Sequence, residues 1–347
     1  MPRALKILAG VLIVVAATAI VFAIQFTRFL DGPIVVPEDG VEFEIRSGAA
    51  FRQVADDLGD RGIISDPVFF RAYARIAGEA GNIQAGEYVL DAGLTPRTLL
   101  DKFVSGEVRL YSFTIVEGWT FRELLAALAD DPVVESTLEY DDWPALLADI
   151  GAAESHPEGL FLPETYRFPR GTTDAELLRQ AYELQVNVLE EAWESRAVGL
   201  PLNSPYDALI LASIVEKETA LASERPRIAG VFTRRLQTRM RLQTDPTVIY
   251  GIGVDFNGNL TRRDLRTDTP YNTYTRSGLP PTPIALPGAA AIQAAVNPAD
   301  GTELFFVATG LGDGSHKFSD TKDEHDQAVR EYLARQRANR NRDKQGE

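Results

Sequence analysis

The most constraining feature of the sequence is an apolar run near its N-terminus. Residues 7–24 read ILAGVLIVVAATAIVFAI and contain no charged side chain. A helix of that length, at about 1.5 Å per residue, would be ~27 Å long, close to the thickness of the hydrocarbon core of a bilayer. Arg3 and Lys6 precede the run, which favours a cytoplasmic N-terminus and export of the rest of the chain. The run therefore predicts a transmembrane anchor over residues 7–26, preceded by a cytoplasmic tip of residues 1–6.

A cleaved signal peptide is the alternative interpretation of this segment. The run is long for the apolar part of a signal peptide, and residues 25–28 (Gln-Phe-Thr-Arg) lack the small residues of a cleavage site. We therefore expect an uncleaved helix that crosses the membrane once.

Composition excludes several classes of function. The chain of 347 residues has 35 basic and 50 acidic side chains, and its net charge of -15 disfavours nucleic-acid binding through a general positive field. It has no cysteine, which excludes disulfides, thiol nucleophiles and iron–sulfur clusters. With histidine only at His156, His316 and His325, a histidine-rich metal site is not expected. We predict no metal, no cofactor and no nucleic-acid partner.

A small module is predicted after the anchor. Residues 27–40 contain Gly-Pro and Pro-Glu-Asp-Gly and are typical of a linker. Apolar periodicity and capping signals then predict a β-α-α-β-α order within residues 41–108. The expected elements are a strand at 41–45, helices that start at Phe51 and Pro67, a strand at 85–90 and a helix capped by Thr95.

A larger domain, mixed α and β, is predicted over residues 109–334, which makes the fold class α+β. Its expected elements are a strand at 111–116, helices opened by the capping boxes Thr120–Glu123 and Thr173–Glu176, a helix after Ser204, loops rich in proline and glycine at 267–288 and a strand at 303–309. Residues 335–347 form a polar, mostly basic tail, which we interpret as a fraying helix end or disorder.

The helix after Ser204 carries the first candidate for chemistry. Its residues 208–215 are small or apolar, so it is expected to be buried on most sides, and it runs directly into Glu216-Lys217-Glu218. At about 100° per residue, Glu218 continues the stripe of Leu211 and Ile214. A carboxyl group at the end of a buried stripe has a raised proton affinity, as a general acid needs. A solvated charge cluster where the helix reaches the surface is the alternative.

Two loops carry the second candidate. Residues 241–251 (RLQTDPTVIYG) and 268–284 combine amide, hydroxyl and tyrosine side chains, a mixture that is typical of sugar sites. Within them we single out Gln243, Asp245, Asn272 and Tyr274. Ordered turns built by Asp-Pro and Tyr-Asn are the alternative explanation of the same residues.

Five stretches in order resemble the membrane-bound endolytic murein transglycosylases, the MltG or YceG-like family. They are EGLFLPETYRF at 158–168, ASIVEKETA at 212–220, MRLQTDPTVIYG at 240–251, YNTYTRSGLPPTPI at 271–284 and HKFSDTKDEHDQAV at 316–329. The similarity covers almost the whole chain, and residues 41–105 resemble the LysM-like module of the family. The resemblance implies a YceG-like catalytic domain anchored in the inner (cytoplasmic) membrane and facing the periplasm or extracytoplasmic space.

The resemblance also implies a reaction. The family cleaves the β-1,4 bond between N-acetylmuramic acid and N-acetylglucosamine in nascent peptidoglycan strands and leaves a 1,6-anhydro end. Glu218 would be the catalytic residue, first as general acid and then as general base. Gln243, Asn272 and Tyr274 would bind sugar, and Glu216 would support the site rather than act as a second catalyst. Asp245 either contacts substrate, at the acetamido group or the cationic transition state, or caps a turn before Pro246.

The expected partners are peptidoglycan strands and the inner membrane, with peptidoglycan synthases (penicillin-binding proteins) as further candidates. Two other functions remain open at this point. A muramidase on the same site would use water in place of the C6 hydroxyl, and its product would be heavier by one water. The LysM-like module would support an anchored glycan-binding scaffold without turnover, although the intact ASIVEKETA stretch favours an enzyme.

Overall fold

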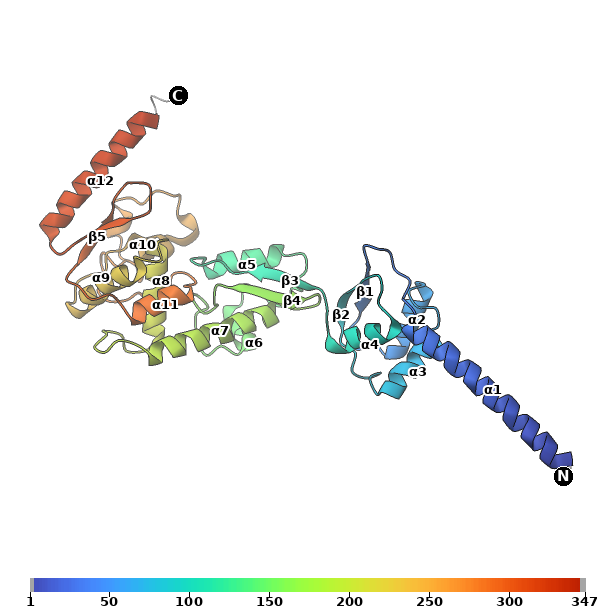
Figure 1. The fold of residues 1–347 in the computed structure, drawn as a ribbon. Helices are drawn as coiled ribbons and strands as arrows, with labels where there is room; N and C mark the ends of the chain where they lie inside the picture. Colours follow the sequence, from blue (N-terminus) through green and yellow to red (C-terminus); the bar gives the residue numbers. More distant parts are fainter. Residues whose placement is uncertain (1–2, 344–347) are drawn as a thin grey trace. The chain divides into compact units, whose positions relative to one another are not determined.

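The computed structural model describes residues 3–343, and the chain divides into two compact units (Figure 1). The first unit holds the chain up to Tyr111 together with Arg167–Gly171. The second holds Ser112–Tyr166 and the chain from Thr172 onward. The predicted mixture of helices and strands, with an apolar helix at the N-terminus, is confirmed.

The first unit begins with helix α1 (Arg3–Asp31), which is long and apolar enough to cross a membrane. It does not stop at the predicted end of the anchor but continues into the segment expected to be a linker. The reason lies in its last turn, where Leu30 is 2% exposed and Asp31 pairs with Arg97 at 2.8 Å. Packing against the following module therefore extends the helix beyond the apolar run.

The rest of the first unit has the predicted β-α-α-β-α order. Strands β1 and β2 are antiparallel, with Val41 opposite Leu90 and Ile45 opposite Gly86. The alternation of the sequence places Phe43 in the core, where it stacks with Phe103. The elements are β1 (Val41–Ile45), α2 (Phe51–Asp60), α3 (Pro67–Ala77), β2 (Gly86–Leu90) and α4 (Pro96–Ser105).

A two-stranded sheet of β3 (Leu110–Thr114) and β4 (Thr165–Pro169) follows. Strand β4 was not predicted, because its residues fall in a stretch that we interpreted only as a motif. Helices α5 (Phe121–Asp130), α6 (Trp143–Ile150) and α7 (Asp174–Glu194) belong to the second unit. Both predicted capping boxes are confirmed: Thr120 with Glu123 opens α5, and Thr173 with Glu176 opens α7.

The core of the second unit is built around helix α8 (Pro205–Glu218). Ser204 caps it by accepting the backbone N–H of Asp207 at 3.2 Å, as the sequence predicts. All residues from Ala208 to Val215 are buried, and the helix packs against α7, α9, α10 and α11. The backbone becomes extended at Thr219, so α8 ends at Glu218. The neighbours are α9 (Arg225–Gln237), α10 (Asp245–Ile252) and α11 (Ala289–Val296).

The C-terminal part of the second unit is a hairpin followed by a helix. Strands β5 (Phe305–Ala308) and β6 (His316–Ser319) are antiparallel, with Phe306 opposite Phe318. Helix α12 (Lys322–Asp343) includes most of the predicted tail, so the described part of that tail is helical; residues 344–347 lie outside the described residues. Residues 267–288, which were predicted to be loops, contain only turns, bends and irregular segments in the described structure.

Candidate functional site

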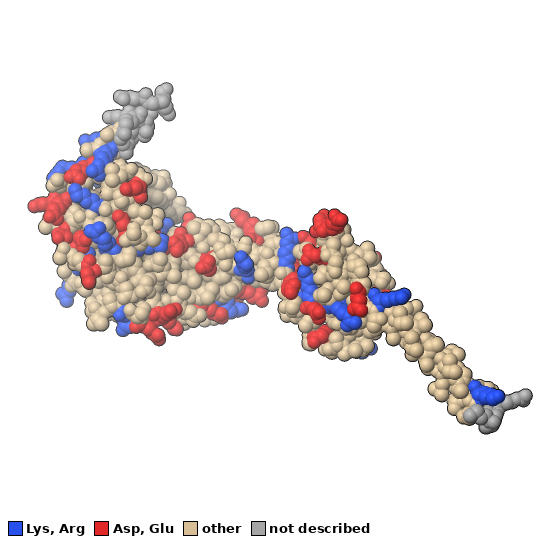
Figure 2. All heavy atoms as spheres, viewed as in Figure 1, with Lys and Arg blue, Asp and Glu red and all other residues tan. Residues whose placement is uncertain are grey.

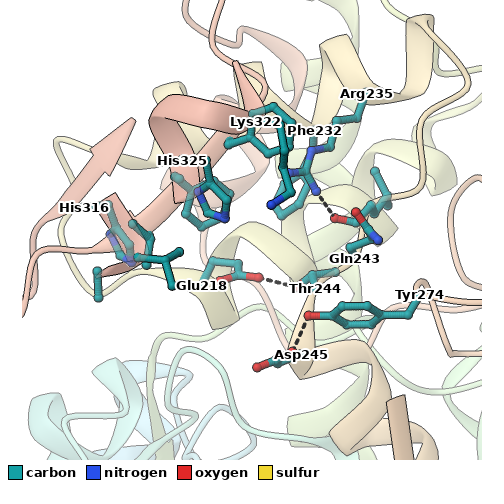
Figure 3. Close-up of a pocket in the computed structure, with 16 residues that line it drawn as sticks. Glu218, Phe232, Arg235, Gln243, Thr244, Asp245, Tyr274, His316, Lys322 and His325 are labelled. Carbon is teal, nitrogen blue, oxygen red and sulfur yellow. Dashed lines mark hydrogen bonds between the residues drawn. The ribbon is translucent and has the colours of Figure 1, made fainter. Parts of the chain in front are cut away.

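A cavity of about 390 Å³ lies at the C-terminal end of α8. It brings together four of the six residues singled out in the sequence, namely Glu218, Gln243, Asp245 and Tyr274. The remaining lining residues are Phe232, Arg235, Leu242, Thr244, Phe305, Phe306, Val307, Ala308, His316, Lys322, His325 and Val329. The polar side chains of residues 243–245 and of Tyr274 thus face an aromatic and basic wall. This wall is formed by α9, the β5–β6 hairpin and α12 (Figure 3).

Glu218 is the half-buried carboxyl group of this cavity. It is the last residue of α8, and its carboxylate points toward Thr244, whose hydroxyl donates a hydrogen bond to Oε1 (Figure 3). Burial raises the pKa of Glu218; the Thr244 hydrogen bond partly opposes this, and the charge of Asp245 reinforces it. The site therefore holds a carboxyl group whose protonated form persists to higher pH than that of an exposed glutamate.

Thr244 is held by a buried network of hydroxyl groups. Its backbone N–H donates to Thr273 Oγ1 at 3.1 Å, and its carbonyl accepts from Thr247 Oγ1 at 2.8 Å. The hydroxyls of Thr247 and Thr273 are 2.9 Å apart. All three side chains are buried, so the partner of Glu218 has little freedom to move.

Asp245 is paired with Tyr274. The phenol Oη donates to Asp245 Oδ1 at 2.5 Å, and burial together with the carboxylate raises the pKa of Tyr274. Asp245 is also the first residue of α10, followed by Pro246, so the Asp-Pro pair starts a helix rather than an isolated turn. Its carboxylate bonds a residue of the other loop instead of capping its own turn.

Gln243 has an unusual backbone. Its φ of 50° lies in the left-handed region, which a residue with a side chain adopts at an energetic cost. Its N–H donates to the carbonyl of Thr273 at 3.2 Å, which ties the first loop to the second. The exposed side chain of Gln243 therefore projects from a backbone that is fixed by this contact and lines the cavity.

Asn272 is not among the residues that line the cavity, contrary to our expectation. It is completely buried, and its Nδ2 donates to the carbonyls of Asp264, Leu265 and Thr267, the closest at 2.7 Å. Its Oδ1 accepts the N–H of Tyr274 at 2.9 Å. The amide of Asn272 therefore makes its hydrogen bonds within the loop that carries Tyr274. Because the side chain is completely buried, it does not present a group to a sugar.

Glu216 is also not among the lining residues. Its side chain is 4% exposed, and it accepts hydrogen bonds from Arg225 Nη2 at 2.8 Å and from the N–H of Gly288 at 3.0 Å. Arg225 is itself buried and pairs in addition with Glu117 at 2.9 Å. Glu216 therefore joins α8 to α9 and to the start of α11, as a structural group rather than a sugar ligand.

Sequence reasoning missed the basic and aromatic wall of the cavity. Arg235 donates to the carbonyls of Leu304 and Leu242, and its guanidinium lies over the ring of Phe305. In Figure 3, Arg235, Lys322 and His325 lie across the cavity from Asp245 and Tyr274. The C-terminal motif HKFSDTKDEHDQAV contains four residues that line the cavity, His316, Lys322, His325 and Val329, so the motif itself was the signal that could have located this wall.

Two histidines belong to this wall. His316 Nδ1 lies 2.7 Å from Glu224 Oε2, and its backbone N–H donates to the same carboxylate at 2.9 Å. His325 stacks on Phe305. Among the described residues, no group of three or more His, Asp or Glu side chains is arranged to hold a metal ion. The cavity thus offers one protonatable carboxyl group, a carboxylate–phenol pair and aromatic faces, which suits acid–base chemistry on a sugar polymer.

Comparisons with known proteins agree with this chemistry. A family model described as the YceG-like family matches residues 43–331. A Bacillus subtilis protein named endolytic murein transglycosylase is 31% identical over 311 residues, which cover 85% of each chain. A Streptococcus pneumoniae protein of the same name is 27% identical over 324 residues, 83% of this chain and 58% of that one. A crystal structure of a YceG-like protein from Listeria monocytogenes aligns with a TM-score of 0.52 and 29% identity, covering 84% of this chain and 99% of that one.

Proposed function

Because the chain belongs to the YceG-like family, we propose that it performs the reaction for which its curated relatives are named, endolytic cleavage of murein by transglycosylation. It is an enzyme, a lyase that acts on peptidoglycan. The bond we assign is the β-1,4 link between N-acetylmuramic acid and N-acetylglucosamine in nascent strands. The observation that carries the proposal is the position of Glu218, a half-buried carboxyl group with a raised pKa in the cavity.

Glu218 acts twice in the proposed mechanism. Its protonated carboxyl group donates a proton to the glycosidic oxygen, and the bond from that oxygen to C1 of the muramic acid breaks. The C6 hydroxyl of the same sugar then bonds to C1 and closes the 1,6-anhydro ring. The hydroxyl proton passes to the Glu218 carboxylate, which restores the starting state without water.

The other cavity residues position the strand in this proposal. Asp245, held by the Tyr274 phenol, accepts a hydrogen bond from the acetamido group or balances the positive charge that develops at C1. The side chain of Gln243 and the faces of Phe305 and Phe306 provide polar and apolar contacts to sugar rings. Asp245 is also a second carboxylate in the same cavity, which a hydrolytic muramidase would require.

The N-terminal parts have proposed roles as well. We infer that α1 anchors the protein in the inner membrane with residues 1–6 in the cytoplasm, since Arg3 and Lys6 precede the apolar run. The β1-α2-α3-β2 arrangement supports a LysM-like module that binds glycan. Peptidoglycan synthases are proposed partners, because nascent strands are the product of those enzymes.

Digestion of purified, uncrosslinked glycan strands tests the reaction. We expect products with 1,6-anhydro ends, each lighter by one water than a product with a reducing end. We predict that Glu218→Gln retains the fold, checked by circular dichroism and thermal melting, and lowers the cleavage rate at least 100-fold, because general acid–base catalysis by one group contributes about 10²–10⁴.

Three results would contradict this assignment. Products with reducing ends from the unaltered protein would indicate a muramidase. Release of anhydro products by Glu218→Gln at a rate close to that of the unaltered protein would remove Glu218 from the acid–base role. Strand binding without any cleavage by the unaltered protein would favour a scaffold.

A further inference from the structure

Helix α3 carries an apolar face that the first unit leaves uncovered. At about 100° per residue, Val68, Ala72 and Ile76 fall on the side away from the buried Phe70 and Ala74. The side chains of Val68 and Ile76 are 59% and 77% exposed. Single exposed apolar residues are ordinary in soluble proteins, so these two side chains alone do not indicate a binding surface. The elements that pack beside them must supply the evidence.

The neighbour of this face is helix α1. Phe69, which lies on α3 between the exposed and buried sides, packs edge-on against three phenylalanines of α1. Its ring centroid lies 5.1 Å from that of Phe22, 5.5 Å from that of Phe26 and 5.8 Å from that of Phe29. The buried Leu30 and the Asp31–Arg97 ion pair hold the end of α1 on the same unit. Helix α3 and the last turns of α1 are therefore one packed assembly.

The charges of α1 indicate the level at which this assembly meets a bilayer. Lys6 and Arg28 are the charged residues that flank the apolar run, and the segment between them would span about 30 Å as a helix. Figure 2 shows most of the visible surface of α1 without charged side chains. Phe22 and Phe26 lie inside the uncharged segment and Phe29 lies beyond Arg28, so Phe69, which contacts all three, is level with the end of the segment that would cross the hydrocarbon.

One arginine lies beside the exposed face of α3, and another lies at the end of the apolar run of α1. Arg75 is exposed and neighbours Ile76, and Arg28 is exposed at the end of the apolar run. Arginines at the edge of an apolar face can extend to lipid phosphates while their stems cover hydrocarbon. An apolar face bordered by arginine, continuous with a membrane-spanning helix, is suited to the bilayer interface.

We propose that α3 lies in the headgroup region of the bilayer that α1 crosses, with Val68 and Ile76 in contact with lipid and Arg75 at the phosphates. This inference rests on the proposed membrane anchor. It goes beyond that anchor because it places the N-terminal module against the membrane surface. A module held there meets glycan strands close to the membrane where they are made.

The absence of cysteine in the chain allows a direct test. Single variants Val68→Cys and Ile76→Cys are labelled with a nitroxide in the full-length protein, which is reconstituted into vesicles of phosphatidylethanolamine and phosphatidylglycerol. Collision rates with oxygen, which concentrates in lipid, and with a water-soluble nickel chelate are measured by electron paramagnetic resonance. Ile13→Cys, exposed in the middle of α1, and Val198→Cys, fully exposed in the second unit, are the lipid and water controls.

We expect labels at Val68 and Ile76 to show an oxygen-to-nickel ratio several-fold above that of Val198 and below that of Ile13. Ratios equal to that of Val198, with Ile13 in lipid, would overturn the position of α3 and leave the anchor intact. Labels shielded from both reagents would indicate a protein contact, such as a second copy, and would also overturn it. A water-exposed Ile13 would refute the anchor and this inference together, whereas cleavage of glycan strands would remain a separate measurement.

Discussion

At the level of single residues, two neighbours change the pKa of Glu218 in opposite directions. The hydroxyl of Thr244 donates a hydrogen bond to the carboxylate and stabilises its charged form, while the negative charge of Asp245 destabilises it. Burial outweighs the hydrogen bond, so the pKa is raised overall. Since a general acid must be protonated, the proposed activity should fall as the pH rises through this raised pKa.

We predict that Thr244→Val moves this alkaline limb of kcat/KM to higher pH, because it removes a bond that favours the carboxylate. Asp245→Asn should move the limb to lower pH, because it removes a repelling charge. The pH–rate profiles of both variants on glycan strands are the measurement. Thr247→Val is the matched control, since Thr247 donates its hydrogen bond to the carbonyl of Thr244, whereas the bond to the Glu218 carboxylate comes from the Thr244 hydroxyl. Shifts in the same direction for both site variants would contradict this electrostatic account.

The two glutamates of the EKE triplet should respond differently to the same substitution. Glu216→Gln removes the charge that faces the buried Arg225, although Glu117 still pairs with that arginine. We predict a loss of about 1–3 kcal/mol in the free energy of unfolding, measured by urea denaturation. The value of kcat/KM should stay within a few-fold of that of the unaltered protein at a temperature where both are folded.

Lys217→Gln is the control within the triplet, because the exposed Lys217 donates only to the carbonyl of Gly118. Its stability should change by less than about 0.5 kcal/mol, as is usual for surface substitutions. A loss of activity in Glu216→Gln as large as that in Glu218→Gln would show that the two carboxyl groups act as a pair.

At the level of elements, Glu158 connects two helices of the second unit. Its Oε1 accepts the N–H of Phe121, the first residue of α5, at 2.9 Å, and its Oε2 accepts the phenol of Tyr250 in α10 at 3.0 Å. Burial raises the pKa of Glu158 to about 7. Helix α10 begins at Asp245, so this buried carboxyl group supports an element that carries a cavity residue.

We predict that Glu158 makes the protein less stable as the pH rises from about 4.5 to 7. Its folded pKa lies above its unfolded one, so the folded state binds more protons in this range, and the stabilisation present at acid pH is lost at neutral pH. The stability of Glu158→Gln relative to that of the unaltered protein should be about 2.5 kcal/mol higher at pH 8 than at pH 5. Urea denaturation of both proteins at the two pH values checks this; a constant difference would show that Glu158 does not titrate there.

At the level of the whole molecule, the apolar helix is structurally continuous with the first folded unit. Its last turn is buried against that unit through Leu30 and paired through Asp31. A signal peptidase needs an extended, accessible segment after the apolar run, and here that segment is helical through Asp31. The proposed anchor is therefore also a part of the folded first unit.

We predict that the mature protein retains its first thirty residues. Expression of the full chain in a bacterial host, membrane extraction and intact mass measurement would detect the complete N-terminal helix. The same protein should float with vesicles in a density gradient, while alkaline carbonate should fail to release it. An N-terminus that begins after Phe26 would instead identify a cleaved signal peptide.

Local patterns in the sequence were sufficient for most of the elements. Caps at Thr120, Thr173 and Ser204, the alternation of 41–45 and the apolar run at 7–24 depend on residues within one or two turns of each other. The position of Glu218 at the end of the buried stripe of α8 follows from the same periodicity. These features could be predicted because helix and strand periods and capping bonds are short-range.

Only the tertiary structure decided which residues share the cavity. Asn272 and Tyr274 are two positions apart. Asn272 donates its side-chain hydrogen bonds to loop carbonyls, whereas Tyr274 lines the cavity. His316 and His325 line the same cavity as Glu218 because β5 packs against α9 and α12 packs against both strands of the β5–β6 hairpin. Such contacts join residues far apart in the chain, and they are set by packing and hydrogen-bond satisfaction rather than by local pattern. Sequence periodicity therefore determined that Glu218 lies at the end of the buried stripe of α8. Long-range packing determined which other side chains share its cavity.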